Sequence, residues 1–282
     1  MKLNKTTADI FVPDGMEITE ALKRTTHLAI GAHQDDLEIK DYHGIAECYN
    51  SETKWFTGIV VTNGAGSARS GRYADYTDDE MQQVRREEQR KAASIGQYAA
   101  QFQLNFPSSE VKDISNHDVV DDLFSILEIA KPEVVYVHNL ADKHETHVAT
   151  ALRTIKAIRM LPLAERPETV YGTEVWRDLD WLSDDDKIAL PVNKNPELAM
   201  ELVEVFESQI AGGKRYDLAT KGRRLANATY HSSHTVDECN ALIFAMDLTP
   251  LIKDDTIDIK NFIAEKIENF KSDVENKITN LI

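Results

Sequence analysis

The stretch THLAIGAHQDDLE, residues 26–38, decides the expected fold of this chain. Its first half is short and apolar and ends in small residues, as a buried strand of a parallel sheet does. His33, Asp35 and Asp36 follow this strand directly. In parallel sheets flanked by helices, ligands bind beyond the carboxyl ends of the strands. These three polar side chains are therefore expected at a binding site.

An imidazole and two carboxylates in one tight turn can form half of a metal site. His33 and Asp36 could converge on one ion, while Asp35 stays free for proton transfer. A structural alternative is that the turn is the N-terminus of a helix, with Asp35 or Asp36 as its cap. The turn alone leaves both interpretations open.

A second cluster of ligand-type residues ends another β-rich run, EVVYVHNLADKHETH at residues 133–147. His144 and His147 are spaced i, i+3, so they share one face of the helix expected to begin there. With His138, three of the nine histidines lie at this strand end. A single histidine is more often an ordinary polar loop residue, but ligand clusters at two strand ends favour a metal site.

These residues resemble the motifs of the PIG-L/LmbE-like zinc-dependent de-N-acetylases, the N-acetylglucosaminyl deacetylase superfamily. The family motifs are Ala-His-Pro-Asp-Asp-x-Glu and a later His-Pro-Asp-His, where this chain has AHQDDLE at residues 32–38 and HETH at residues 144–147. RREEQRKAASIG at residues 85–96 resembles the family's Arg-Arg-Glu-Glu helix. The resemblance spans residues 25 to 180 in rough outline.

Carried over by position, the resemblance implies that zinc is held by His33, Asp36 and His147. It also implies that Asp35 is the general base and that His144 is the acid or the group that stabilises the oxyanion. Two histidines and one carboxylate suit zinc, but iron(II) or cobalt(II) would suit the same ligands.

The chain departs from the family pattern at three places. Gln34 replaces a proline, which removes no ligand. Glu145 and Thr146 replace Pro-Asp, so the family's aspartate is missing, and Asp142 or Glu145 could instead supply a carboxylate that orients a neighbouring histidine. FPSSE at residues 106–110 stands where family members often have a Pro-Asp-Gly turn, which puts the pocket on that side in doubt.

Two segments are expected to contact substrate. The resemblance implies that Arg85 reaches the mouth of the active site, although an exposed helix face with an Arg85–Glu88 ion pair would also explain this arginine. The loop at residues 62–73 is rich in glycine and serine and follows a strand, so it is positioned to line the pocket, with Asn63 binding substrate. Its glycines do not form a nucleotide-binding motif.

Composition excludes several classes of partner. The net charge of −16 over 282 residues argues against binding to nucleic acid or to an anionic membrane. Only two cysteines, Cys48 and Cys239, are present, and residues 1–10 lack the apolar core of a signal peptide. No apolar run approaches the roughly 18 residues that span a bilayer. These features predict a cytoplasmic protein without a membrane segment.

The alternation of apolar patterns predicts an α/β fold, a Rossmann-like, mostly parallel sheet flanked by helices. The resemblance implies that this fold is of the LmbE-like type. Strands are expected near residues 26–32, 56–62, 101–106, 133–138 and 169–175. Helices are expected near residues 41–50, 78–95, 117–130 and 145–160. Residues 1–252 are expected to form the deacetylase domain, with 176–252 as an elaboration around the site, and 253–282 to form an amphipathic helix.

Two later segments have open interpretations. EVWRDLDWL, residues 174–182, could form a sugar-stacking wall or cap the core. The C-terminal stretch has an apolar stripe at three- and four-residue steps, which predicts one helix that docks on its own domain or on another subunit and favours a homo-oligomer. The stripe comprises Phe262, Ile263, Ile267, Phe270, Val274, Ile278 and Leu281.

The two ligand clusters predict a metal site, and the resemblance implies a zinc-dependent hydrolase that removes the N-acetyl group from an amino-sugar substrate, such as an N-acetylglucosamine derivative. One alternative is another metal-dependent hydrolase, acting on a phosphoester or a different amide, although phosphoester chemistry often uses two bridged metals. The other is a catalytically silent sugar-binding protein.

Overall fold

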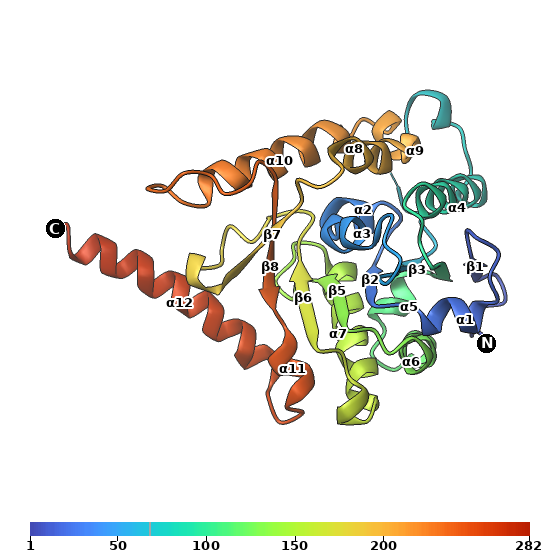
Figure 1. The fold of residues 1–282 in the computed structure, drawn as a ribbon, viewed down its shortest axis with the longest axis horizontal. Coiled ribbons are helices and arrows are strands. Elements are labelled where there is room, and N and C mark those ends of the chain that lie inside the picture. The colour runs from blue at the N-terminus through green and yellow to red at the C-terminus, as the bar shows by residue number, and fades with distance from the viewer. Residues whose placement is uncertain (68) are drawn as a thin grey trace.

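The computed structural model describes residues 1–67 and 69–282. An eight-stranded sheet runs through the molecule in the order β1-β4-β3-β2-β5-β6-β8-β7 (Figure 1). Its strands are β1 (Asp9–Phe11), β2 (His27–Gly31), β3 (Phe56–Thr62), β4 (Ala100–Phe106), β5 (Val134–His138), β6 (Thr169–Thr173), β7 (Lys187–Pro191) and β8 (Leu242–Asp247).

The central strands are parallel, as predicted. β2 pairs in parallel with both β3 and β5, and β4 and β6 extend the parallel sheet on either side. The outer strands β1, β8 and β7 run antiparallel to their neighbours. A mostly parallel sheet with antiparallel edges confirms the expected fold class.

Helices cover both faces of the sheet (Figure 1). The helices are α1 (Ile18–Lys23), α2 (Asp36–Lys40), α3 (Tyr42–Cys48), α4 (Asp78–Ile95), α5 (Ser108–Lys112), α6 (Asp118–Ala130), α7 (Glu145–Met160), α8 (Pro196–Glu204), α9 (Glu207–Ala211), α10 (Tyr216–Tyr230), α11 (Thr249–Lys253) and α12 (Ile259–Thr279). Among the described residues, none of these helices combines the length and the apolar character needed to cross a membrane.

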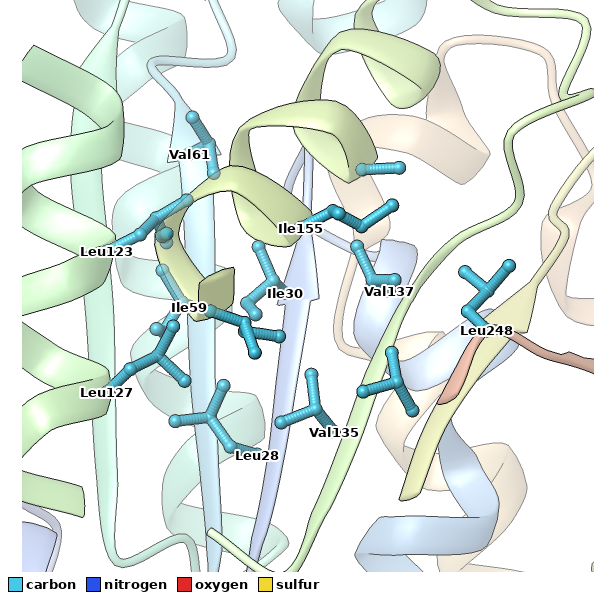
Figure 2. Close-up of a cluster of buried hydrophobic side chains, with 14 of the residues drawn as sticks. Leu28, Ile30, Ile59, Val61, Leu123, Leu127, Val135, Val137, Ile155 and Leu248 are labelled. Carbon is cyan, nitrogen blue, oxygen red and sulfur yellow. The ribbon is translucent and has the colours of Figure 1, made fainter. Parts of the chain in front are cut away.

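The two large cores lie on opposite faces of the sheet because neighbouring residues of a strand point to opposite faces. Leu28 and Ile30 of β2 pack in one core with residues of α6 and α7, and Figure 2 shows Ile30 next to Ile155 and Leu28 near Leu127 in this cluster. Ala29, between them, belongs to the opposite core with residues of α2, α3 and α4. Burial on both faces explains why Leu28, Ala29 and Ile30 of β2 are all apolar.

Residues 176–252 form part of the central sheet. They supply β7 and β8, and β8 lies between β6 and β7 in the same sheet. The sequence did not predict these two strands, nor the three-residue edge strand β1. The expected division into residues 1–252 and 253–282 stays a prediction.

The predicted C-terminal helix is α12. Phe262 and Ile263 pack against the core at its beginning. Farther along, the same stripe is exposed, with Ile267 47% and Ile278 54% accessible. Figure 1 shows the end of α12 extending away from the sheet.

Candidate active site

The turn after β2 brings both aspartates of the AHQDDLE motif to the carboxyl edge of the sheet. Asp35 adopts the left-handed conformation, with φ 92°, and occupies the N-cap position of α2 without a capping bond from its side chain. The His33 backbone N–H donates to Asp36 Oδ2 over 2.7 Å. A Cβ on Gly31 would come within 2.9 Å of Asp36 Cβ, so glycine allows α2 to start this close to β2. The helix-start and ligand interpretations therefore describe the same turn.

Three ligand-type side chains converge above this turn. His33 Nδ1 lies 3.4 Å from Asp36 Oδ2 and 3.2 Å from His147 Nε2, and His147 Nε2 lies 3.7 Å from Asp36 Oδ1. Ligands about 2.0–2.2 Å from a tetrahedral zinc ion stand about 3.3–3.6 Å apart. The three side chains, 3.2–3.7 Å apart when each distance is taken to the nearer Asp36 oxygen, therefore come close to the spacing for such an ion, and their donor types suit it.

His138 adds a buried imidazole that the sequence left without a role. Its Nε2 lies 3.1 Å from Asp36 Oδ2 and accepts from the Ala32 backbone N–H over 2.9 Å. Its ring stacks on His147, with centroids 3.9 Å apart. Asp36, His138 and His147 form one cluster able to hold a metal, and His33, His144 and His147 form an overlapping one. The one feature of the sequence that could have identified His138 as a site residue was its position at the carboxyl end of β5.

Asp142 supports His147. Its Oδ2 lies 3.1 Å from His147 Nδ1, and its Oδ1 accepts from the His144 backbone N–H over 2.8 Å. Because a carboxylate only accepts, the His147 proton is on Nδ1, which leaves the Nε2 lone pair facing His33 and Asp36. Glu145, the other candidate, is exposed and lies 3.7 Å from Lys112 Nζ.

The two aspartates have opposite electrostatic environments. Burial raises the pKa of Asp35, and the charge of Asp36 raises it further, while Arg85 acts in the other direction. Burial also acts to raise the pKa of Asp36, but His147 and His138 hold it well below its usual range. One carboxylate is thus kept ionised beside the imidazoles, and its neighbour more readily takes a proton.

His144 sits at the rim of the site, where it precedes α7. Its ring centroid lies 4.6 Å from that of His147 and 5.0 Å from that of His33. Burial lowers the pKa of His144, and His147 and His33 lower it further. The exposed position gives His144 access to a ligand in the cavity.

Arg85 is buried, so the solvated helix face that could have explained it is wrong. Its Nη1 donates to the Gly64 carbonyl oxygen over 3.1 Å. Gly64 has φ 73°, and a Cβ there would lie 2.5 Å from Gln34 Oε1 and 2.9 Å from Arg85 Cδ. Glycine at this position lets the loop after β3 pack over both side chains. Within that loop, Ala68 lies outside the described residues.

These side chains face one cavity of about 410 Å³. Asn63 lines it, and its Oδ1 accepts from the Ala65 backbone N–H over 3.2 Å. Ser108 and Lys112 of α5 also line it, so the departure at residues 106–110 contributes to the pocket wall. The predicted residues that line the cavity are His33, Asp35, Asp36, Asn63, Arg85, His144 and His147.

One protein-family model matches part of this chain. Residues 28–158 match the model of the PIG-L family, described as GlcNAc-PI de-N-acetylase. The resemblance expected from the motifs is confirmed over this segment, and it supports an N-deacetylase activity. None of the curated proteins matches the sequence.

Solved structures with this fold have diverse sequences. The conserved protein TT1542 from Thermus thermophilus is 16% identical, with a TM-score of 0.62 over 83% of this chain and 99% of that one. The N,N'-diacetylchitobiose deacetylase from Pyrococcus horikoshii is 15% identical, with a TM-score of 0.60 over 84% and 88%. GalB, the 4-carboxy-2-hydroxymuconate hydratase from Pseudomonas putida, is also 15% identical, with a TM-score of 0.60 over 79% and 96%. At these identities the likeness shows the fold alone.

Proposed function

We propose that this protein is a zinc-dependent N-deacetylase, which hydrolyses the acetamide of an amino-sugar substrate, such as an N-acetylglucosamine derivative, and releases acetate. The observation that carries the proposal is the convergence of His33, Asp36 and His147 beside Asp35 at the base of one cavity. The match of residues 28–158 to a de-N-acetylase family supports the same chemistry.

In this proposal His33, Asp36 and His147 hold the metal, and Asp142 orients His147 through its Nδ1 proton. Zinc, when bound, supplies Lewis-acid polarisation of the amide carbonyl and activation of water, and iron(II) or cobalt(II) could replace it. His138 lies beside Asp36 on the protein side, with its Nε2 3.1 Å from Asp36 Oδ2.

Asp35 acts as the general base. Amide hydrolysis adds water to the carbonyl carbon and then breaks the C–N bond, so one group must accept a proton from water and another must protonate the leaving amine. Asp35 is buried and faces the cavity, and its raised pKa makes it a better proton acceptor than an ordinary aspartate.

His144 provides the other half of the proton transfer. It lies on the rim beside His33 and His147, where it can stabilise the developing oxyanion and protonate the amine nitrogen. Arg85 and Asn63 line the same cavity and bind the polar groups of the substrate.

Acetate release from a panel of N-acetylated amino sugars tests the proposal, measured together with metal content. Acetate release with about one metal ion per chain supports the deacetylase. About two metal ions per chain with phosphatase activity would favour a phosphoesterase instead. Sugar binding without metal or turnover would favour a catalytically silent binding protein.

A further inference from the structure

A second cavity, of about 740 Å³, lies beside the active site and has no role in the proposed reaction. Residues of α10, of β7 and β8, and of the segment 176–184 line it, and Figure 1 shows these elements together. We call this cavity the outer groove. Its aromatic lining residues are Trp176, Trp181, Tyr230 and Phe244.

Trp176 connects the outer groove to the active site, because it lines both cavities. The Nη2 atom of Arg223 donates to the Trp176 carbonyl oxygen over 3.2 Å, and Arg223 also bonds to the carbonyl oxygen of Val175. The Trp176 ring lies edge-on to Tyr216, with centroids 6.3 Å apart. A long ligand that extends past this ring would occupy both cavities.

The charges in the outer groove balance. Arg177, Lys187 and Arg223 are opposed by three aspartates, which are Asp178, Asp180 and Asp184. A strongly anionic or cationic ligand would gain little from such a lining. A neutral ligand with many hydroxyl groups would find both donors and acceptors there.

Sugar rings have this combination of properties. A pyranose presents an apolar C–H face, which packs on aromatic rings, and a rim of hydroxyl groups, which pair with carboxylate, amide and guanidinium groups. Tyr230 is 83% exposed at the end of α10, so its ring is accessible to such a face. Asn227 lines the groove one turn earlier on the same helix.

We propose that the outer groove is a distal sugar-binding subsite and that the substrate is an N-acetylated oligosaccharide whose neighbouring sugar units cross Trp176. This inference rests on the proposed function for the acetylated unit at the active site. The proposal for the outer groove itself predicts only that a glycan binds there, whether or not it is deacetylated.

The test compares N-acetylglucosamine with its β-1,4-linked dimer, trimer and tetramer as substrates. For the wild type, kcat/KM should rise with chain length. Tyr230→Ala should reduce the tetramer-to-monomer ratio about 2- to 10-fold, the worth of one aromatic contact, and leave monomer turnover unchanged. Leu225→Ala is the matched control, because Leu225 is 47% exposed on the same helix and does not line the groove.

Binding of the tetramer, followed by tryptophan fluorescence, separates this proposal from the proposed function. Tetramer binding that exceeds monomer binding and weakens in Tyr230→Ala supports the groove even if no acetate is released. Equal affinities for monomer and tetramer, or a Tyr230→Ala variant with wild-type tetramer binding, would overturn it even if the monomer is deacetylated.

Discussion

Asp142→Asn tests how the candidate metal ligands are oriented. In the wild type, Asp142 accepts from His147 Nδ1 at 3.1 Å and from the His144 backbone N–H at 2.8 Å. Asparagine keeps one acceptor oxygen, which can still bond the backbone N–H. Its amide N–H₂ then faces His147 Nδ1 and favours the tautomer with the proton on Nε2, the atom needed for the metal.

The burial of the Asp142–His147 contact determines how much zinc affinity Asp142→Asn should lose. Asp142 is 8% and His147 2% exposed, so solvent screens their contact little. A hydrogen bond to a charged group contributes about 1.5–3 kcal/mol, which corresponds to about 10- to 100-fold in affinity. Loss of groups that orient metal ligands has effects of the same order. We expect zinc to bind Asp142→Asn about 10- to 100-fold more weakly.

Competition with a chromogenic chelator measures this affinity. Asp254→Asn is the control, because Asp254 Oδ1 accepts from the Thr256 backbone N–H over 2.8 Å in a similar turn near α11. The metal-free melting temperature should change little in either variant. Zinc affinity within twofold of wild type in Asp142→Asn, or an equal loss in Asp254→Asn, would refute the orienting role.

Other perturbations test separate parts of the molecule. Asp35→Asn should keep the metal and lower deacetylation about 10²- to 10⁴-fold, because the amide cannot accept a proton; loss of zinc would show that the roles of Asp35 and Asp36 are exchanged. Burial raises the pKa of the Asp122 carboxyl group to about 6 in the folded protein. The unfolded chain releases this proton above about pH 4, whereas the folded protein keeps it. The free energy of unfolding therefore falls as the pH rises from about 4 through about 6. The melting temperature of Asp122→Asn, which stays neutral, should therefore increase relative to wild type from pH 4 to 7, and a pH-independent difference would contradict this sign. Truncation after Ile257 removes the exposed stripe of α12, and light scattering should then show a smaller particle if the protein is a homo-oligomer; an unchanged mass with a lower melting temperature would mean that α12 only covers its own subunit.

The central fold was predictable because its signals are local. β2, β3 and β5 are short, mostly apolar and largely buried, and α7 follows β5 with apolar residues such as Ala151, Ile155 and Ile158 on its buried face. The strand β8 is also apolar, but its place between β6 and β7 depends on pairing with residues more than fifty positions away. No local pattern carries that information.

The sequence predicted which ligand-type residues lie at the strand ends. The turn after β2 and the start of α7 bring His33, Asp36 and His147 together because parallel strands end at one edge. The partner of Asp142 was not predictable, because it depends on the ring orientation of His147 on the first turn of α7. The sequence placed His138 in the histidine cluster at this strand end but gave it no role, and its stacking on His147 and its 3.1 Å distance from Asp36 Oδ2 show that it contacts the site.

Zinc occupancy of three single variants tests the central claim most directly. His33→Ala, Asp36→Ala and His147→Ala should each lose metal at a chelator concentration that leaves wild type with about one zinc ion per chain, since two remaining ligands hold the ion poorly. His234→Ala, at an exposed position, should retain it. Full zinc retention in all three ligand variants under these conditions would contradict the account.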